Sequence, residues 1–276
     1  MKVGYQGEKG SYSEAAIYKH YGKNVEAIGL ETFDDVFEAV KNNKIDQGFL
    51  PFENTIAGSV VENYDLLLKE DVFVIAEVFL KIIHNLLSHK GNKFENIKKA
   101  YSHSHALHQC HGFLREHNIK SVPEYDTAGA VKIVKKMGKM DEAAIASELC
   151  ADIYGLDILE KGIGTNNHNT TKFFVIVKKE NVPKDLKKEK TSIVFKVKHH
   201  PGALVSCLQR LSKNDINMTK LESRPIPENP WDYVFFVDFE SGLDEENVKL
   251  TLSEMEAASI FVKVLGSYPK GDKTCK

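Results

Sequence analysis

The sequence has few cysteines, and they lie far apart. Only 4 of the 276 residues are cysteine, and no two of them have the Cys-x-x-Cys spacing of a zinc or redox motif. This distribution argues against a disulfide framework and against a thiolate metal site, and it favours a reduced protein of the cytoplasm. The four are Cys110, Cys150, Cys207 and Cys275.

Long hydrophobic runs and a large charge of one sign are also lacking. The longest apolar stretch, residues 72–87, is interrupted by Glu77, Lys81, His84 and Asn85, so we expect no membrane span. The first seven residues already have a strand pattern and contain no apolar signal region. The formal net charge is −2 with both signs interspersed, which gives neither a basic block for nucleic acid nor an acidic tail. We therefore expect no nucleic-acid partner.

Strand and helix signals alternate along the first two thirds of the chain, which predicts a mostly parallel α/β sheet. The predicted strands are Val3–Gln6, Gly48–Phe52, Lys99–Tyr101, Ala143–Ala146 and Phe173–Lys178. The predicted helices are 11–22, Phe33–Asn42, Val60–Lys69, Ala106–His117, Ala128–Met137 and one that ends near Gly155. Ser11 followed by Glu14, and Thr32 followed by Asp35, have the spacing of capping boxes at two helix starts.

A charged segment with little structural signal, residues 178–190, separates this part from a second pattern. Its lysines and acids are expected to serve only solvation. The pattern that follows is βαββαβ, which is the order of a ferredoxin-like domain. Its predicted elements are Ser192–Val197, Pro201–Lys213, Met218–Glu222, Tyr233–Phe239, Glu245–Ala257 and Ile260–Leu265. Such small domains commonly dimerise, so we expect an oligomer, and we expect the tail from Lys270 onward to be disordered.

Polar motifs stand where predicted strands end and helices begin, at residues 10–13, 54–59, 102–105 and 126–127. Open α/β sheets bind ligands outside the carboxyl ends of their strands, and the N–H groups of helix N-termini there suit an anion. Residues 165–172 add eight consecutive hydrogen-bonding or charged side chains directly before an apolar strand. Together these patterns predict a site for a small polar anion.

Two cofactor classes can be weighed against these motifs. Gly7-x-x-Gly10 does not match the dinucleotide fingerprint, so we expect no nucleotide cofactor. His105, His108 and His111 lie roughly along one face of a predicted helix, with Cys110 nearby, and a zinc site is a less favoured alternative. Exposed histidines on a helix capped by Ser102 or Ser104 explain the same pattern.

Together the motifs resemble the prephenate dehydratase family, in order and over nearly the whole chain. The motifs are Gly4-Tyr5-Gln6-Gly7 with Gly10-Ser11-Tyr12-Ser13-Glu14, Pro51-Phe52-Glu53-Asn54-Thr55, Ser102-His103 with Ala106-Leu107-His108-Gln109-Cys110, Asp126-Thr127-Ala128, and Thr171-Lys172-Phe173. The C-terminal part resembles the ACT regulatory domain. Its effector motifs would be Gly202-Ala203-Leu204 and Glu222-Ser223-Arg224-Pro225.

The resemblance implies a catalytic domain over residues 1–179, built of two α/β lobes like the type 2 periplasmic binding proteins, with the active site in the cleft. A linker over 180–190, an ACT domain over 191–268 and a tail over 269–276 would follow. The implied reaction is the decarboxylation and dehydration of prephenate to phenylpyruvate without a cofactor or metal. L-Phenylalanine would inhibit it through the ACT domain, in a homodimer or homotetramer.

The resemblance also implies roles for single residues. Thr171 would help to protonate the leaving hydroxyl group. Glu53 is expected, from its place after a predicted strand rather than from the resemblance, to satisfy backbone N–H groups of its loop. The substrate-binding residues would be Ser11, Ser13, Asn54, Thr55, Thr127, Lys172 and Phe173. Lys172 stands where the family has arginine, so it either pairs with a substrate carboxylate or supports the loop. Ser104-His105 stands where the family usually has Pro-Gln.

Two other functions stay open. An arogenate dehydratase would perform the same chemistry on the aminated substrate, and a non-catalytic amino-acid-sensing protein could use the same scaffold. No chorismate mutase segment precedes Met1, so we expect a monofunctional chain.

Overall fold

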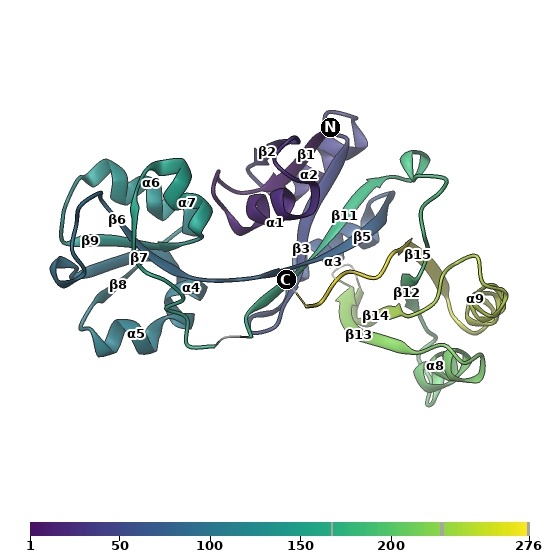
Figure 1. Ribbon diagram of the computed structural model, residues 1–276. Coiled ribbons are helices and arrows are strands. Elements are labelled where there is room, and N and C mark those ends of the chain that lie inside the picture. Colours follow the sequence, from purple (N-terminus) through teal and green to yellow (C-terminus); the bar gives the residue numbers. More distant parts are fainter. Residues whose placement is uncertain (167, 227–228, 275–276) are drawn as a thin grey trace. The chain divides into compact units, whose positions relative to one another are not determined.

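The computed structural model describes residues 1–166, 168–226 and 229–274. The chain forms two compact units, and each draws on more than one segment (Figure 1). The first contains Met1–Asn63 and Val78–Phe173, with Lys273 and Thr274. The second contains Tyr64–Glu77 and Phe174–Asp272. Residues 64–77 therefore pack with the C-terminal part of the chain, although they come early in the sequence.

In the first sheet of the first unit, β1 pairs in parallel with both β2 and β3, and β4 pairs antiparallel with β3. The strands are β1 (Lys2–Gln6), β2 (Glu26–Leu30), β3 (Gln47–Asn54) and β4 (Gly58–Ser59), and the helices are α1 (Tyr12–Tyr21), α2 (Phe33–Lys41) and the start of α3 (Val61–Lys69). Thr32 and Asp35 form the predicted capping box. Only half of the other box forms: Ser11 accepts from Glu14 N–H, but the Glu14 carboxylate accepts from Gly10 N–H at 2.5 Å.

The second sheet has the strand order β10-β6-β9-β7-β8. Its strands are β6 (Asn85–Ser88), β7 (Lys99–His103), β8 (Lys120–Glu124), β9 (Glu142–Ala146) and β10 (Asp157–Glu160), and its helices are η1 (Phe94–Asn96), α4 (Ser104–Gln109), α5 (His111–Glu116), α6 (Thr127–Met137) and α7 (Glu148–Tyr154). β7 is parallel to β8 and β9, whereas β6 and β10 are antiparallel to their neighbours. The unit is thus α/β as predicted, and its two sheets agree with the two α/β lobes that the resemblance implies.

Both faces of the second sheet are covered by helices, and successive side chains of a strand pack against opposite faces. Ala144 of β9 packs in one buried cluster with α6 and α7, and Ala143 and Ile145 pack in another with α4 and α5. Figure 1 shows α6 and α7 on one face and α5 on the other. The prediction of a single helix over 106–117 is wrong, because the backbone of Cys110 has φ −104° and ψ 7° and separates α4 from α5.

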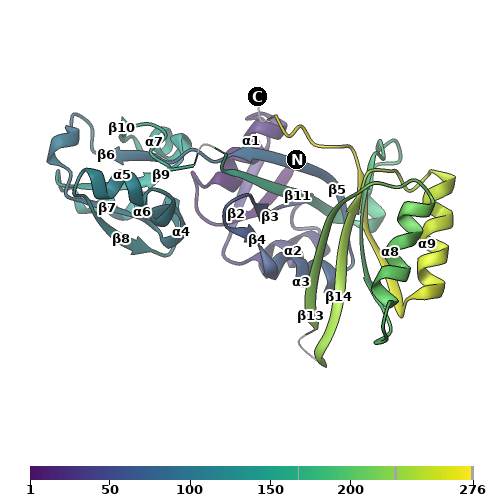
Figure 2. The ribbon, with the colours of Figure 1, turned by 90° about the horizontal axis from the view of Figure 1, so that it is seen from below.

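The second unit has the predicted ferredoxin-like βαββαβ order. Its elements are β12 (Lys190–Lys196), α8 (Ala203–Lys213), β13 (Met218–Ile226), β14 (Asn229–Phe239), α9 (Glu246–Ala258) and β15 (Phe261–Tyr268). The four strands lie in the order β13-β14-β12-β15, and all three neighbouring pairs are antiparallel. Helices α8 and α9 lie side by side over one face of this sheet (Figures 1 and 2). Two further strands, β5 (Val72–Lys81) and β11 (Thr170–Lys178), contribute residues to both units.

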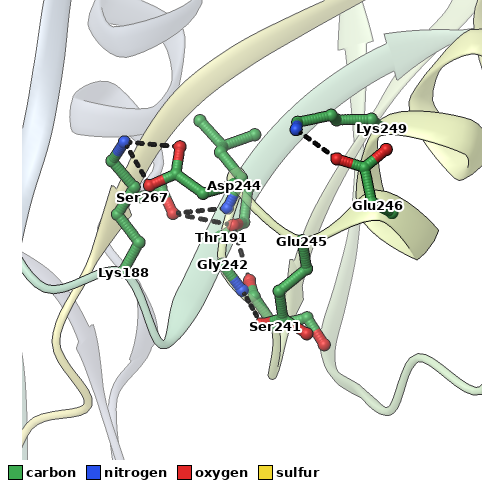
Figure 3. A network of polar contacts seen from close by, with 10 residues as sticks. Lys188, Thr191, Ser241, Gly242, Asp244, Glu245, Glu246, Lys249 and Ser267 are labelled. Atoms are coloured by element: carbon green, nitrogen blue, oxygen red, sulfur yellow. Dashed lines mark hydrogen bonds and ion pairs between the residues drawn. The ribbon is translucent and has the colours of Figure 1, made fainter.

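Two lysines of the predicted linker are not merely solvated. Lys190 is 4% exposed, and its Nζ lies 2.6 Å from Oε2 of Glu77, which is also 4% exposed. Lys188 Nζ lies 2.8 Å from both carboxylate oxygens of Asp244 (Figure 3). The expectation that these charges serve only solvation is therefore wrong for both residues. Between the end of β11 at Lys178 and the start of β12 at Lys190, the chain forms only one short 3-10 helix, η2 (Lys179–Asn181).

Polar contacts next to this segment hold the loop before α9 (Figure 3). Thr191 Oγ1 donates to the carbonyl of Ser241 at 2.7 Å, and the N–H of Gly242 donates to Glu245 Oε1 at 2.6 Å. A Cβ on Gly242 would lie 2.2 Å from the carbonyl oxygen of Lys188, so this position requires glycine.

The start of the tail is held as well. The N–H of Lys270 donates to Glu189 Oε2, and the N–H of Gly271 donates to Glu77 Oε1, both at 3.1 Å. The prediction of a disordered tail is therefore wrong for these two residues. Cys275 and Lys276 lie outside the described residues.

Candidate active site

A cavity of about 410 Å³ lies in the first unit, at the strand ends and helix starts where the polar motifs were predicted to meet. Residues of the first sheet, such as Gln6 and Asn54, and of the second sheet, such as His103, both line this cavity. It therefore corresponds to the cleft expected for a fold of two α/β lobes. Its lining residues are Gln6, Tyr12, Ser13, Pro51, Asn54, Ala57, Ile82, His84, His103, His105, Ala106, Gln109, Tyr125, Asp126, Thr127, Thr171 and Phe173.

Thr171, near the start of β11, is 8% exposed and lines this cleft. Its Oγ1 accepts a hydrogen bond from Nδ2 of Asn54 at 3.0 Å. The orientation of the Asn54 amide follows from its other end, where Oδ1 accepts from the N–H groups of Ile56 and Ala57, both at 2.9 Å. Because a hydroxyl group has one hydrogen and two lone pairs, Thr171 keeps its own O–H available for a ligand.

A row of hydrogen bonds continues from Asn54 across the cleft wall. Asn54 Nδ2 donates to Asn169 Oδ1 at 2.7 Å, and Asn169 Nδ2 donates to Gln109 Oε1 at 2.9 Å. The same Gln109 oxygen lies 2.6 Å from His84 Nε2, and His84 Nδ1 lies 2.8 Å from the hydroxyl of Tyr12. Since Gln109 Oε1 only accepts, the neutral His84 ring carries its hydrogen on Nε2 and has its lone pair on Nδ1. The single hydrogen of the Tyr12 hydroxyl is shared between this Nδ1, at 2.8 Å, and the carbonyl of Ile83, at 2.9 Å.

His84 and Tyr12, which are neighbours at one end of this row, stay uncharged. Burial lowers the pKa of His84, and the hydrogen bond to Gln109 opposes this only partly. Burial raises the pKa of Tyr12 well above its usual value. The row is therefore a chain of neutral donors and acceptors, which fixes the Asn54 amide against Thr171.

The residues predicted to bind substrate separate into two groups. Ser13, Asn54, Thr127 and Phe173 line the cleft together with Thr171. Ser11 instead caps α1 through Glu14 N–H, at 3.3 Å. The side chains of Thr55 and Lys172 likewise contact other protein groups and do not line the cleft.

Thr55 joins its loop to the start of β11. Its Oγ1 donates to the carbonyl of His168 at 2.7 Å and accepts from the N–H of Thr170 at 2.9 Å. Lys172 is 8% exposed, and its Nζ lies 3.4 Å from Glu53 Oε2. Of the two roles predicted for Lys172, this ion pair favours support of the loop. Glu53, expected to bind backbone N–H groups, is the carboxylate that Lys172 contacts.

Four members of the row were given no role from the sequence: Tyr12, Gln109, His84 and Asn169. Gln109 stands in one of the motifs and Asn169 in the polar stretch before β11, so a signal was present for both. His84 shows only as a polar residue that interrupts an apolar segment. Its bonding partners, Tyr12 and Gln109, are 72 and 25 residues away in sequence, and this pairing is not visible in local pattern.

The histidines proposed as an alternative metal site do not converge. Across residues 1–166, 168–226 and 229–274, no group of three or more His, Cys, Asp or Glu side chains could hold a metal ion. His105 lines the cleft, whereas His108 and His111 line a different cavity of about 520 Å³. Within the same described ranges, no helix is long and apolar enough to cross a membrane.

The predicted effector residues lie in the second unit. Gly202, with φ 80°, precedes α8, Ala203 is buried, and Leu204 packs against the core of this unit. The other motif lies within β13 rather than at a strand end as predicted. The charge of Arg224 is already paired within this unit, since its Nη2 lies 3.0 Å from Oδ2 of Asp65.

Comparison with known proteins decides the family, because the family model described as prephenate dehydratase matches residues 3–181. The chain belongs to the prephenate dehydratase family. It is 39% identical to the chloroplastic arogenate dehydratase/prephenate dehydratase 2 of Arabidopsis thaliana, over 98% of this chain and 73% of that protein. It is 40% identical to the bifunctional chorismate mutase/prephenate dehydratase of Aquifex aeolicus, over 98% of this chain and 74% of that protein.

Solved structures with a similar fold include a member of this family. The prephenate dehydratase of Arthrobacter aurescens, in complex with L-Phe, matches with a TM-score of 0.89 and 26% identity, over 100% of this chain and 91% of that one. A protein described as a novel type of quorum-quenching acylase also matches with a TM-score of 0.89, at 28% identity over 100% of both chains.

Proposed function

We propose that the cleft converts prephenate to phenylpyruvate, carbon dioxide and water, a step of phenylalanine biosynthesis. The observation that carries this proposal is the hydrogen bond from Asn54 Nδ2 to Thr171 Oγ1, at 3.0 Å. It occupies an acceptor position on Thr171 and leaves the O–H of Thr171 to donate to the hydroxyl group that leaves the substrate.

The reaction needs a donor at one end of the ring. The C–C bond to the ring carboxylate breaks, and its electron pair moves through the ring as carbon dioxide departs. The C–O bond at the opposite ring carbon then breaks, and the oxygen leaves as water once it receives a proton. A fixed donor at that oxygen stabilises the charge that develops there, and the row behind Asn54 holds the donor in place. Because a threonine hydroxyl is a weak acid, water in the cleft restores the proton.

The same contact argues against Thr171 as a nucleophile. An attacking hydroxyl needs a base that accepts its hydrogen. Among the contacts of the described residues, Thr171 Oγ1 has an amide N–H as its partner and neither an imidazole nor a carboxylate. This arrangement favours lyase chemistry over the acylase activity for which the similar protein is named.

Arogenate is the second candidate substrate. The Arabidopsis relative is named for both activities, and the carboxylate of Asp126 lines the cleft, where it could accept from the ammonium group of arogenate. A side-by-side measurement of kcat/KM for the two substrates decides between them. A sensing protein without activity would bind one of them and release no carbon dioxide.

For regulation, we propose residues 1–179 as the catalytic domain, 180–190 as linker and 191–268 as an ACT domain that binds L-phenylalanine. The βαββαβ order and the L-Phe complex of the Arthrobacter aurescens relative support this assignment. Its effector residues would be Gly202, Ala203, Leu204, Glu222, Ser223 and Arg224. Phenylalanine should lower turnover and raise the melting temperature, and binding without an effect on turnover would contradict feedback.

We propose a homodimer or homotetramer that works in the cytoplasm. β13 ends the strand order of its sheet and so leaves backbone groups for pairing with a second copy. Cys110, Cys150 and Cys207 are buried free thiols, which suits a reducing compartment. Analytical ultracentrifugation and cell fractionation test the two statements.

The test of the reaction uses purified wild type, Thr171→Ser and Thr171→Ala with prephenate. We expect Thr171→Ser to keep most of kcat and Thr171→Ala to lose about 10²-fold or more, the size of one lost transition-state donor. Turnover by Thr171→Ala at the wild-type rate would contradict the donor role.

A further inference from the structure

The cleft must hold a dianion, yet none of the described residues that line it is Lys or Arg. Its basic groups are His84, His103 and His105. His84 is excluded as an anion site, because Tyr12 and Gln109 occupy both of its ring nitrogens. Lys172, which stands where the family signature has arginine, contacts Glu53 and is absent from the lining.

His103 and His105 form a pair at the start of α4. Their rings stack with centroids 5.3 Å apart and an interplanar angle of 20°. His103 Nδ1 accepts from the backbone N–H of His105 at 3.3 Å, so its Nε2 carries the hydrogen in the neutral ring. The second ring, His105, is exposed.

We propose that His103 and His105 bind the carboxylate that the substrate keeps, with His105 supplying the positive charge and His103 an N–H donor. This proposal rests on the proposed function for the identity of the substrate. The carboxylate that leaves as carbon dioxide loses its charge in the transition state, so a cation beside it would stabilise the ground state and slow the reaction. The side-chain carboxylate stays charged throughout and can be bound without this penalty.

The surroundings of the two histidines indicate which one is the neutral N–H donor and which one carries the charge. Burial and then His105 lower the pKa of His103, and Asp126 opposes this. Glu124 of β8 lies opposite His103 in the strand register, and Asp126 is occupied at Oδ1 by the N–H groups of Ala128 and Gly129. His103 is thus the neutral donor. His105, whose side chain is exposed, is the ring that supplies the positive charge.

The test compares KM and kcat of wild type, His105→Gln and His105→Lys with prephenate. We expect KM to be about tenfold higher in His105→Gln, the loss of one charge-assisted hydrogen bond, with kcat changed less than about twofold. His105→Lys should keep a KM near the wild-type value, because lysine places a positive charge at the same position.

His108→Gln is the matched control, since His108 is on the same helix but lines the other cavity. Its KM should follow the wild type. A second readout is the affinity for phenylpyruvate, which keeps the same carboxylate, measured by calorimetry. Wild-type KM and wild-type phenylpyruvate affinity in His105→Gln would overturn the proposal. Absence of turnover in the wild type would instead defeat the proposed function, and the calorimetry would still decide this proposal.

Discussion

Replacing Asn54 by aspartate exchanges one amide N–H donor for a carboxylate oxygen at the same place. Oδ1 can go on accepting from the N–H groups of Ile56 and Ala57, so the loop keeps its turn. The second oxygen then stands where Nδ2 lies 3.0 Å from Thr171 Oγ1. Thr171 must donate its hydrogen to that oxygen, and the substrate loses its donor.

The size of the effect follows from this reversal. Removal of one preorganised transition-state donor costs about 10²- to 10³-fold in kcat. The new oxygen also faces Asn169 Oδ1 at 2.7 Å, where two acceptors repel and the Asn169 amide must turn. We therefore expect Asn54→Asp to lie at the upper end of this range, with KM changed much less.

Steady-state assays with prephenate and thermal melts of the same samples measure this effect. Asn42→Asp is the control for the chemical change, because Asn42 is an exposed residue at the end of α2 whose amide contacts Glu38. If Asn54→Asp folds and keeps more than about a tenth of wild-type kcat, the Asn54 amide is not needed to keep the O–H of Thr171 available as a donor.

Two further predictions concern stability. Lys190→Met leaves the buried carboxylate of Glu77 without its cation and should lower the free energy of unfolding by about 3–5 kcal/mol, whereas Lys190→Met with Glu77→Leu should recover most of it. Denaturant melts of both variants check this, and equal stabilities would contradict it. Burial lowers the folded-state pKa of His20, of His84 and, most strongly among its causes, of His103. Their unfolded forms then bind protons first as the pH falls, so stability should decrease below about pH 6.5, with a smaller decrease in His84→Gln. Melting temperatures between about pH 5 and pH 8 measure this, and a flat profile would contradict it.

Local signals predicted the elements that local contacts make. Thr32 with Asp35 and Asp126 with Ala128 bond within three residues, and both helix starts are where the sequence placed them. Six strands were not predicted: β2, β4, β5, β6, β8 and β10. Pairing with neighbouring strands, which sequence pattern does not show, defines short strands such as β10.

The site was predictable in its residues but not in its bonding. The cleft-lining positions Asn54, Thr127 and Thr171 stand in motifs that the sequence displays. Asn54 and Thr171, however, are 117 residues apart, and which atom of the amide faces the hydroxyl depends on the fold. Lys190 and Glu77, 113 residues apart, show the same limit, since a lysine among charged neighbours has the pattern of a solvated residue.

The most direct test of the account is the rate of phenylpyruvate formation from prephenate by wild type and by Thr171→Ala at equal concentration. We predict turnover by the wild type and a loss of about 10²-fold or more in a variant that folds normally. Absence of turnover in the wild type, or an equal rate in the variant, would contradict it.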